Sequence, residues 1–189
     1  MSSRSREKKT GLLFAVRELL SISIYVFIVL AATWVIKNYV FTRNVVVGNS
    51  MQYTLENGDN LIVDRFSYHF SDPERFDIIV FPYKHQANTY YIKRIIGLPG
   101  ETVKIDEDGI IYINGKELSE SYGREVIKDP GRALNGVTLG RDEYFVMGDN
   151  RNDSVDSRMQ DVGNIMRKDI VGKAVFRIWP FGSIGRIGK

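Results

Sequence analysis

An uninterrupted apolar run near the N-terminus is the first clear feature of the chain. Residues 19–36 carry no charge, and two serines and a threonine are their only polar interruptions. As a helix this run would be about 27 Å long, close to the roughly 30 Å hydrocarbon core of a bilayer. Trp34 and Tyr39 add aromatic rings near its end, where such rings favour a membrane interface. The pattern predicts a transmembrane helix over residues 19–37.

Two other interpretations of this run are a buried core helix and a cleavable signal peptide. A charge-free run directly after a basic tail is less typical of a core helix. The apolar region of a signal peptide covers about 7–15 residues and ends at a small-x-small site. Residues 31–33, Ala-Ala-Thr, match such a site weakly, and the apolar run continues beyond them. We therefore interpret the segment as an uncleaved signal anchor.

The excess positive charge of the chain lies in the tail before this run. Residues 1–18 hold five of the 26 basic and two of the 23 acidic residues, so 21 of each sign remain in the rest. The body of the protein is therefore neutral, and we expect no nucleic-acid partner. Because basic residues stay on the cytoplasmic side, the pattern predicts a cytoplasmic tail at 1–18 and a single-pass anchor in the cell membrane at 19–37. Residues 38–189 then form an extracytoplasmic domain.

Beyond residue 40, short runs rich in β-branched and aromatic residues predict β-strands. They cover residues 44–47, 60–63, 77–81, 90–96, 103–106, 110–113, 143–147 and 173–178. Asp-Gly and Asn-Gly pairs between them predict tight turns. Glycine-rich residues 119–140 predict an exposed loop or small insertion, and 163–169 predict a helical turn. We expect a mainly β, partly closed barrel-like domain with a hairpin and loop insertion at about 102–142.

The composition excludes several kinds of chemistry. The chain has no cysteine, so a disulfide framework, a thiolate zinc site, an iron–sulfur cluster and a cysteine nucleophile are impossible. The two histidines, His69 and His85, cannot form a three-histidine metal site and make a histidine-based triad improbable. We expect neither a metal ion nor an organic cofactor. For hydrolytic chemistry, a serine paired with a neutral lysine remains.

Two positions could supply such a pair. Ser50 follows a predicted strand in a small, flexible stretch that would expose its hydroxyl, although serines at strand ends are usually turn or capping residues. Lys93 and Arg94 lie on opposite faces of the strand at 90–96, so each face carries a cation among apolar groups. Either this is an edge strand protected by charges, or the lysine is buried and its pKa is lowered enough for it to accept a proton. Arginine stays charged and cannot serve as the base.

Residues 148–158 form a third unusual segment, with three acids, two arginines, two serines and two asparagines among eleven residues. A solvated loop and a calcium loop are both conceivable. The spacing differs from the helix-loop-helix calcium pattern, however, and two arginines would repel a cation. We favour a network of Asp–Arg pairs that supports an active site.

Taken together, these segments resemble the bacterial type I signal peptidases, in particular the small single-anchor kind of Gram-positive bacteria, which are serine proteases with a Ser–Lys dyad. The four blocks that carry the resemblance, in the family's order, are residues 50–55, 75–81, 91–101 and 148–158. The resemblance implies a membrane-bound serine endopeptidase that cleaves signal peptides from secretory precursor proteins after small residues of the Ala-x-Ala type. Its partners would be those precursors and the lipid bilayer.

The family also implies roles for individual residues. Ser50 would be the nucleophile and Lys93 the general base, and Ser154 would orient the lysine amine by a hydrogen bond. The structural members of the site would be Asp149, Arg151, Asp156 and Arg158, with Asp156 and Arg158 the nearest to a salt-bridge pair. The pockets for small substrate side chains would be lined by Val46, Met51, Leu55, Tyr91 and Ile92.

The chain departs from the family at two positions. The family usually has proline where Tyr53 stands, so we expect a less rigid turn after the nucleophile. Some members have a serine in place of Gly48 whose hydroxyl helps to bind the oxyanion. Without it, the backbone N–H of Ser50 would carry more of that stabilisation.

Two rival functions remain open, namely a Ser–Lys protease that cleaves a soluble regulator or itself, and a catalytically inactive membrane scaffold. The apolar stretch at residues 176–181 is compatible with a place in the core or with membrane contact.

Overall fold

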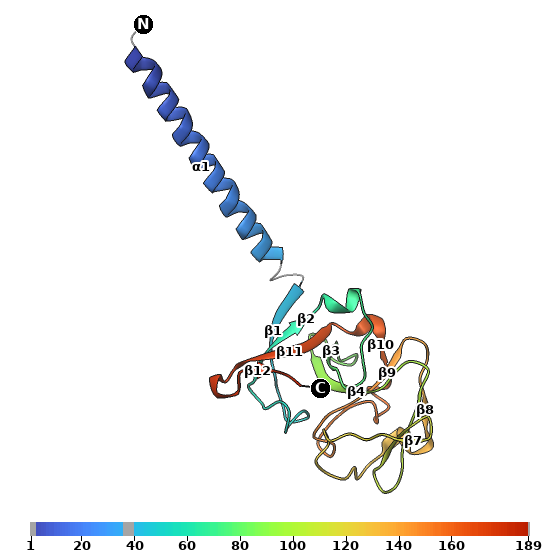
Figure 1. The fold of residues 1–189 in the computed structure, drawn as a ribbon. Helices are drawn as coiled ribbons and strands as arrows, with labels where there is room; N and C mark the ends of the chain where they lie inside the picture. Colours follow the sequence, from blue (N-terminus) through green and yellow to red (C-terminus); the bar gives the residue numbers. More distant parts are fainter. Residues whose placement is uncertain (1–2, 36–39, 189) are drawn as a thin grey trace. The chain divides into compact units, whose positions relative to one another are not determined.

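The computed structural model describes residues 3–35 and 40–188, and side chains from residue 16 onward (Figure 1). The chain divides into two compact units at residues 1–40 and 41–189. The boundaries of tail, anchor and catalytic domain expected from the sequence stay a prediction.

The N-terminal unit contains one long helix, α1, Ser3–Val35. It begins within the expected tail, so the helix is longer than the predicted membrane segment. Val16–Val35 is long and apolar enough to cross a membrane. Every side chain of this stretch is exposed, so the core-helix interpretation is wrong. Residues 36 and 37 of the predicted anchor, and Tyr39, lie outside the described residues.

The second unit is built on an eight-stranded sheet in which all neighbours are antiparallel. Seven strands follow the order β1-β2-β11-β3-β4-β9-β10, and β12 pairs with β11. Their bounds are β1 Phe41–Val45, β2 Asn60–Asp64, β3 Ile78–Pro82, β4 Tyr90–Gly97, β9 Glu143–Met147, β10 Ile165–Met166, β11 Gly172–Trp179 and β12 Gly185–Arg186. The mainly β class is confirmed, and closure into a barrel stays a prediction.

A smaller antiparallel sheet has the order β7-β6-β5-β8. Its strands are β5 Thr102–Ile105, β6 Ile111–Ile113, β7 Lys116–Glu117 and β8 Val137–Thr138. The Asn-Gly turn between β6 and β7 has positive φ at both residues, as a tight hairpin requires. The segment expected as an exposed loop holds β8 and the 3-10 helix Gly131–Asn135, because Ala133 and Val137 are apolar enough to join the core.

Strand pairing and exposure correct one further expectation, the helical turn at 163–169, and decide between the alternatives left open for β4 and for residues 176–181. Strand β4 pairs with β3 over residues 90–94 and with β9 only from Arg94 onward, but Lys93 and Arg94 are both buried, so the interpretation of these charges as protection of an exposed edge is wrong. The predicted helical turn at 163–169 is strand β10 followed by a single 3-10 turn, Arg167–Asp169. Trp179 and Phe181 are exposed and their rings lie 4.6 Å apart, so neither ring belongs to the core. Membrane contact by these rings stays a prediction.

Candidate active site

Ser50 lies in the turn that follows β1. In this turn the N–H of Gln52 donates to the carbonyl of Asn49 at 2.9 Å, and the N–H of Leu55 donates to Met51 at 2.8 Å. Gly48 enters the turn with φ of +92°, a conformation that favours glycine, so the chain can leave the sheet abruptly just before the serine. The side chain of Ser50 is half-buried and lines a cavity.

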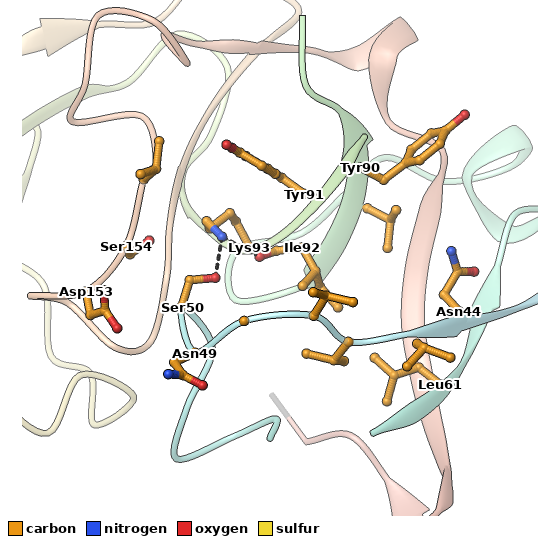
Figure 2. Close-up of a pocket in the computed structure, with 16 residues that line it drawn as sticks. Asn44, Asn49, Ser50, Leu61, Tyr90, Tyr91, Ile92, Lys93, Asp153 and Ser154 are labelled. Atoms are coloured by element: carbon orange, nitrogen blue, oxygen red, sulfur yellow. Dashed lines mark hydrogen bonds between the residues drawn. The ribbon is translucent and has the colours of Figure 1, made fainter. Parts of the chain in front are cut away.

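Lys93 reaches the same point from the middle of the sheet. It lies in β4, opposite Ile79 of β3, and is only 3% exposed. Its Nζ donates to Ser50 Oγ at 2.6 Å and to the carbonyl oxygen of Ile92 at 2.9 Å (Figure 2). The structure therefore brings together the two residues predicted to form the catalytic pair, although they are 43 positions apart in the chain.

Burial changes the proton affinity of this lysine. Loss of hydration disfavours the ammonium and lowers the pKa of Lys93 from its ordinary value of 10.5 to about 8, against the opposing pull of Asp156 and Asp149. At pH 7 about one molecule in ten therefore carries a free amine beside the serine hydroxyl. A serine next to such an amine is the arrangement of Ser–Lys hydrolytic chemistry.

The cavity beside this pair has a volume of about 450 Å³. Three of the five residues predicted to bind substrate, Val46, Tyr91 and Ile92, line it. The other two do not: Met51 and Leu55 are at most 1% exposed and pack in the hydrophobic cluster beneath the nucleophile turn. Sequence reasoning had not singled out the remaining apolar lining residues, which are Val45, Val47, Leu61, Val80 and Val155.

Within residues 148–158, the predicted pair of Asp156 and Arg158 is present. Arg158 donates through Nε and Nη2 to the two carboxylate oxygens, both at 2.9 Å. The same carboxylate accepts the N–H of Gly148 at 3.0 Å. A Cβ at position 148 would lie 2.3 Å from Ser154 Oγ and from the carbonyl oxygen of Ser50, so only glycine allows this close approach.

Asp149 has a partner that sequence reasoning missed. Arg94, fully buried, donates to its carboxylate through Nε at 2.9 Å and Nη2 at 2.7 Å. The guanidinium of Arg94 also lies 3.6 Å from the ring centre of Tyr122 and donates to the carbonyl of Phe76 at 2.8 Å. The sequence did place a cation, Arg94, on the face of this strand opposite Lys93, but it did not indicate which acid would pair with it. These contacts join the loop at 148–158 to the strand that carries Lys93.

Arg151 and Ser154 differ from expectation. Arg151 pairs with Glu120 at 2.7 Å, outside the expected segment, and its Nε donates to the carbonyl of Gly148 at 3.0 Å. Ser154 lines the cavity, but its buried Oγ makes no hydrogen bond among the described residues. The expected hydrogen bond from Ser154 to Lys93 is therefore not formed in this structure, where the amine bonds to Ser50 and Ile92 instead.

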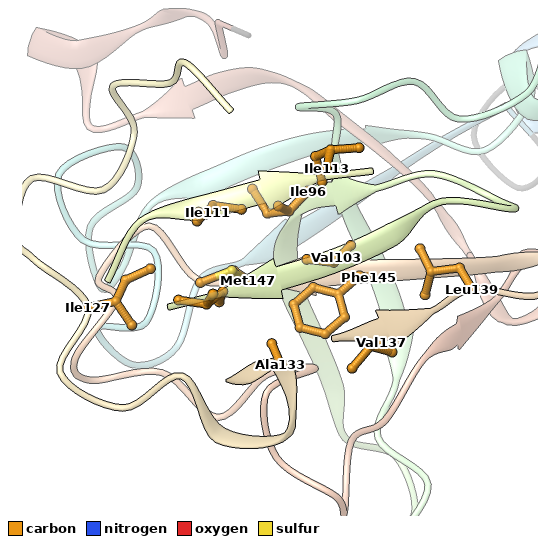
Figure 3. Close-up of a cluster of buried hydrophobic side chains, with 11 residues drawn as sticks. Ile96, Val103, Ile111, Ile113, Ile127, Ala133, Val137, Leu139, Phe145 and Met147 are labelled. Carbon is orange, nitrogen blue, oxygen red and sulfur yellow. The ribbon is translucent and has the colours of Figure 1, made fainter. Parts of the chain in front are cut away.

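The loop at 148–158 is anchored by the strand that precedes it. Phe145 and Met147 of β9 are fully buried in a cluster that joins the two sheets, together with residues of β5, β6 and β8 (Figure 3). The N–H of Asn150 then donates to the carbonyl of Ser50 at 3.1 Å, which ties the loop to the nucleophile turn. The second sheet thereby supports the position of the candidate site.

Tyr53 adopts a backbone conformation that proline cannot. Its φ is +82°, whereas the proline ring holds φ near −65°. The Tyr53 hydroxyl donates to Glu125 at 3.3 Å, and the guanidinium of Arg124 lies 5.1 Å from its ring centre. The tyrosine that replaces the family's proline thus joins the nucleophile turn to Arg124 and Glu125, which follow the β6–β7 hairpin in the chain.

Comparison with known proteins agrees with the resemblance seen in the sequence. The family model described as "Signal peptidase, peptidase S26" matches residues 18–179. An apolar N-terminal helix, a mainly β unit and a serine beside a buried lysine are features of a membrane-anchored serine peptidase. The chain belongs to the signal peptidase family, peptidase S26.

Individual relatives extend over most of the chain. A protein named signal peptidase I from Leptolyngbya laminosa is 41% identical over 160 residues, which are 81% of this chain and 76% of the relative. Signal peptidase I P from Bacillus subtilis subsp. natto is 35% identical and covers 97% of this chain and 98% of its own. A crystal structure of a signal peptidase I from Enterococcus faecalis is 37% identical, with a TM-score of 0.45 over 55% of this chain and 97% of that chain.

Proposed function

We propose that this protein is a membrane-anchored serine endopeptidase that removes N-terminal signal peptides from exported precursors, cutting after small residues of the Ala-x-Ala type. Membership of the signal peptidase family supports the reaction and its substrate class. The observation that carries the proposal is the 2.6 Å contact between Ser50 Oγ and Lys93 Nζ beside the cavity. The proposal needs no metal ion and no organic cofactor.

In the proposed reaction, the neutral amine of Lys93 accepts the proton of the Ser50 hydroxyl as Oγ attacks the carbonyl carbon of the scissile bond. The protonated amine then donates to the leaving nitrogen, and the signal peptide is left as an ester on Ser50. A water molecule, deprotonated by the same amine, hydrolyses this ester. Asp149 and Asp156, held by their arginines, fix the loop at 148–158 around the pair.

We assign to the backbone N–H of Ser50 the stabilisation of the negative charge that develops on the substrate carbonyl oxygen. The N–H of Gly48 is already engaged, since it donates to Asn57 Oδ1 at 3.0 Å. Gly48 also has no hydroxyl, so it offers neither of the donors that a serine there would bring. Loss of one such donor typically lowers the rate by about 10²–10³, which makes the Ser50 N–H correspondingly important.

An extended substrate can pair with the backbone of β4. Strand β9 pairs with β4 from Arg94 onward, so among the described strand pairs residues 90–93 are bonded only to β3. The backbone around Tyr91 and Ile92 therefore has no second strand partner and is open to strand addition, except at the Ile92 carbonyl, which accepts from Lys93 Nζ at 2.9 Å. Val46, Tyr91 and Ile92 leave room beside this edge for small side chains, which fits alanine at the first and third positions before the cut.

Helix α1 would hold the catalytic unit at the membrane surface where precursors emerge. By the positive-inside rule, the basic residues before the apolar stretch keep the N-terminus in the cytoplasm and place the catalytic unit outside.

The proposal is tested with the purified full-length chain in detergent and a precursor that carries an Ala-x-Ala site. Mass spectrometry of the products should show one cut directly after the second alanine. A precursor with bulky residues at both alanine positions serves as the matched control and should remain intact. No cleavage of the first precursor, or cleavage of both, would contradict the proposal.

A further inference from the structure

The three carboxylates of residues 148–158 have different surroundings. Asp149 and Asp156 are completely buried, and each is paired with an arginine. Asp153 is exposed, and among the residues that the structure describes its carboxylate has neither a hydrogen bond nor an ion pair. The two buried acids are thus explained by the scaffold of the site, whereas Asp153 is free to meet a ligand.

Asp153 lines the same cavity as Ser50 and Lys93. Its backbone is held there by two hydrogen bonds, one from its own N–H to the carbonyl of Asn150 and one from the N–H of Asn150 to the carbonyl of Ser50, both at 3.1 Å. Figure 2 shows Asp153 on one side of Ser50 and Leu61 and Tyr90 on the other. The serine therefore separates an apolar part of the cavity from a part that carries a free carboxylate.

The charge of the cavity wall is unbalanced on that side. Of the described residues that line the cavity, only Lys93 and Asp153 are charged. In the reactive form of the proposed mechanism the amine of Lys93 is neutral, so Asp153 is then the one charged group among these lining residues. A substrate that runs past Ser50 toward Asp153 thus meets one negative charge.

We propose that Asp153 is a specificity-determining residue, which favours a basic side chain and disfavours an acidic side chain at the first or second residue after the cleaved bond. This inference rests on the proposed function, because the apolar side of the cavity takes the small residues before the bond and so leaves the Asp153 side for the residues after it. Asp153 acts on the substrate charge and takes no part in bond breaking.

The expected preference follows from the charge interaction at a wet surface. At roughly 6 Å in water, a unit charge changes the binding of another by about threefold. Attraction of lysine and repulsion of glutamate together predict about a tenfold higher kcat/KM for the lysine substrate at low salt. Because the carboxylate is exposed, this preference should fall as ionic strength rises, since the screening length is about 10 Å at 0.1 M and about 3 Å at 1 M.

The experiment uses the full-length chain in detergent and a set of Ala-x-Ala peptides that differ in one residue after the cut. Lysine, glutamine or glutamate is placed at the first or the second position after the bond, and kcat/KM is measured at low and at high salt. The wild type is compared with Asp153→Asn and with Asp161→Asn, a control that removes an exposed carboxylate close in sequence but outside the cavity lining.

We expect the lysine-to-glutamate ratio to be about ten in the wild type and in Asp161→Asn, and about one in Asp153→Asn. In the wild type and in Asp161→Asn, the ratio should also approach one at high salt. A ratio near one in the wild type at low salt, a salt-independent ratio, or an unchanged ratio in Asp153→Asn would overturn the inference. Cleavage of the glutamine peptide separates the two proposals: if it is cut, the proposed function stands whatever the ratio, and if no peptide is cut, the function itself fails.

Discussion

Replacing Lys93 with methionine tests two effects of the buried amine, one on cleavage and one on the stability of the fold. Methionine has a similar length and fits the apolar surroundings of β4, but it has no amine. The substitution should therefore abolish cleavage. Burial of the charged amine destabilises the wild type. We therefore also expect the free energy of unfolding of Lys93→Met at pH 7 to equal or exceed that of the wild type.

The magnitude follows from the lowered pKa of Lys93. In the unfolded chain the amine regains water and its ordinary value of 10.5, whereas in the folded protein the value is about 8. At about 1.36 kcal/mol per pKa unit, burial of the charged amine destabilises the fold by about 3 kcal/mol below pH 8. The methionine variant also loses the two hydrogen bonds of the Lys93 amine, and the Ile92 carbonyl is left without this donor. This loss should offset about 1–3 kcal/mol of the stability gained by removing the buried charge.

The pH dependence is the sharper part of the prediction, because it does not depend on packing. Between pH 8 and 10.5 the unfolded wild type binds more protons than the folded state, so its stability rises with pH. The destabilisation is therefore complete below pH 8 and lost as the pH rises toward 10.5. The advantage of Lys93→Met over the wild type should shrink by about 2.5 kcal/mol between pH 7 and pH 10.

The assay is urea unfolding of the full-length chain in detergent, followed by circular dichroism at several pH values. Lys116→Met is the control, since its exposed side chain is in water in both states. A Lys93→Met variant clearly less stable at pH 7, or a stability difference that does not change with pH, would refute the reasoning. Lys93 would then be charged and well paired in the fold, and it could not be the resting base.

Three further predictions concern the reaction, the buried ion pair and the membrane. The kcat/KM of the wild type should rise about tenfold per pH unit below about pH 8 and level off above it, because the neutral amine of Lys93 is the base; a profile flat from pH 6 to 9 would exclude this. Arg94→Met leaves Asp149 buried without its partner and should lower the free energy of unfolding by about 3–5 kcal/mol, whereas a loss under about 1 kcal/mol would mean that the pair is not needed. Protease added outside intact protoplasts should digest the body and leave a protected fragment of about the first 40 residues, and a protected C-terminal domain would contradict the proposed topology.

Strand β4 illustrates what the sequence could and could not predict. The alternation of side chains correctly placed Lys93 and Arg94 on opposite faces of the strand. The two interpretations of these cations were a protected edge strand and a buried lysine. The choice between them depends on how far β9 and other distant segments cover β4 and bury the two cations. Strand order is decided by contacts between distant segments, so no local pattern could settle it.

The loop at 148–158 shows the same limit for side-chain partners. The pair of Asp156 and Arg158 was predictable, because the two residues are close in sequence. The partners of Asp149 and Arg151 were not, since Arg94 and Glu120 lie far away along the chain. For the same reason Met51 and Leu55 were expected in the substrate pocket: both are apolar and near the nucleophile, but whether they face the cavity or the core depends on how the turn packs.

The central claim is that Ser50 and Lys93 act together as nucleophile and base. The most direct measurement is cleavage of the Ala-x-Ala precursor by Ser50→Ala and Lys93→Ala, at protein levels matched to the wild type and with circular dichroism to confirm folding. Neither group can replace the other, so we predict that each variant loses cleavage while it remains folded and bound to the membrane. More than a small fraction of wild-type activity in either variant would contradict the account.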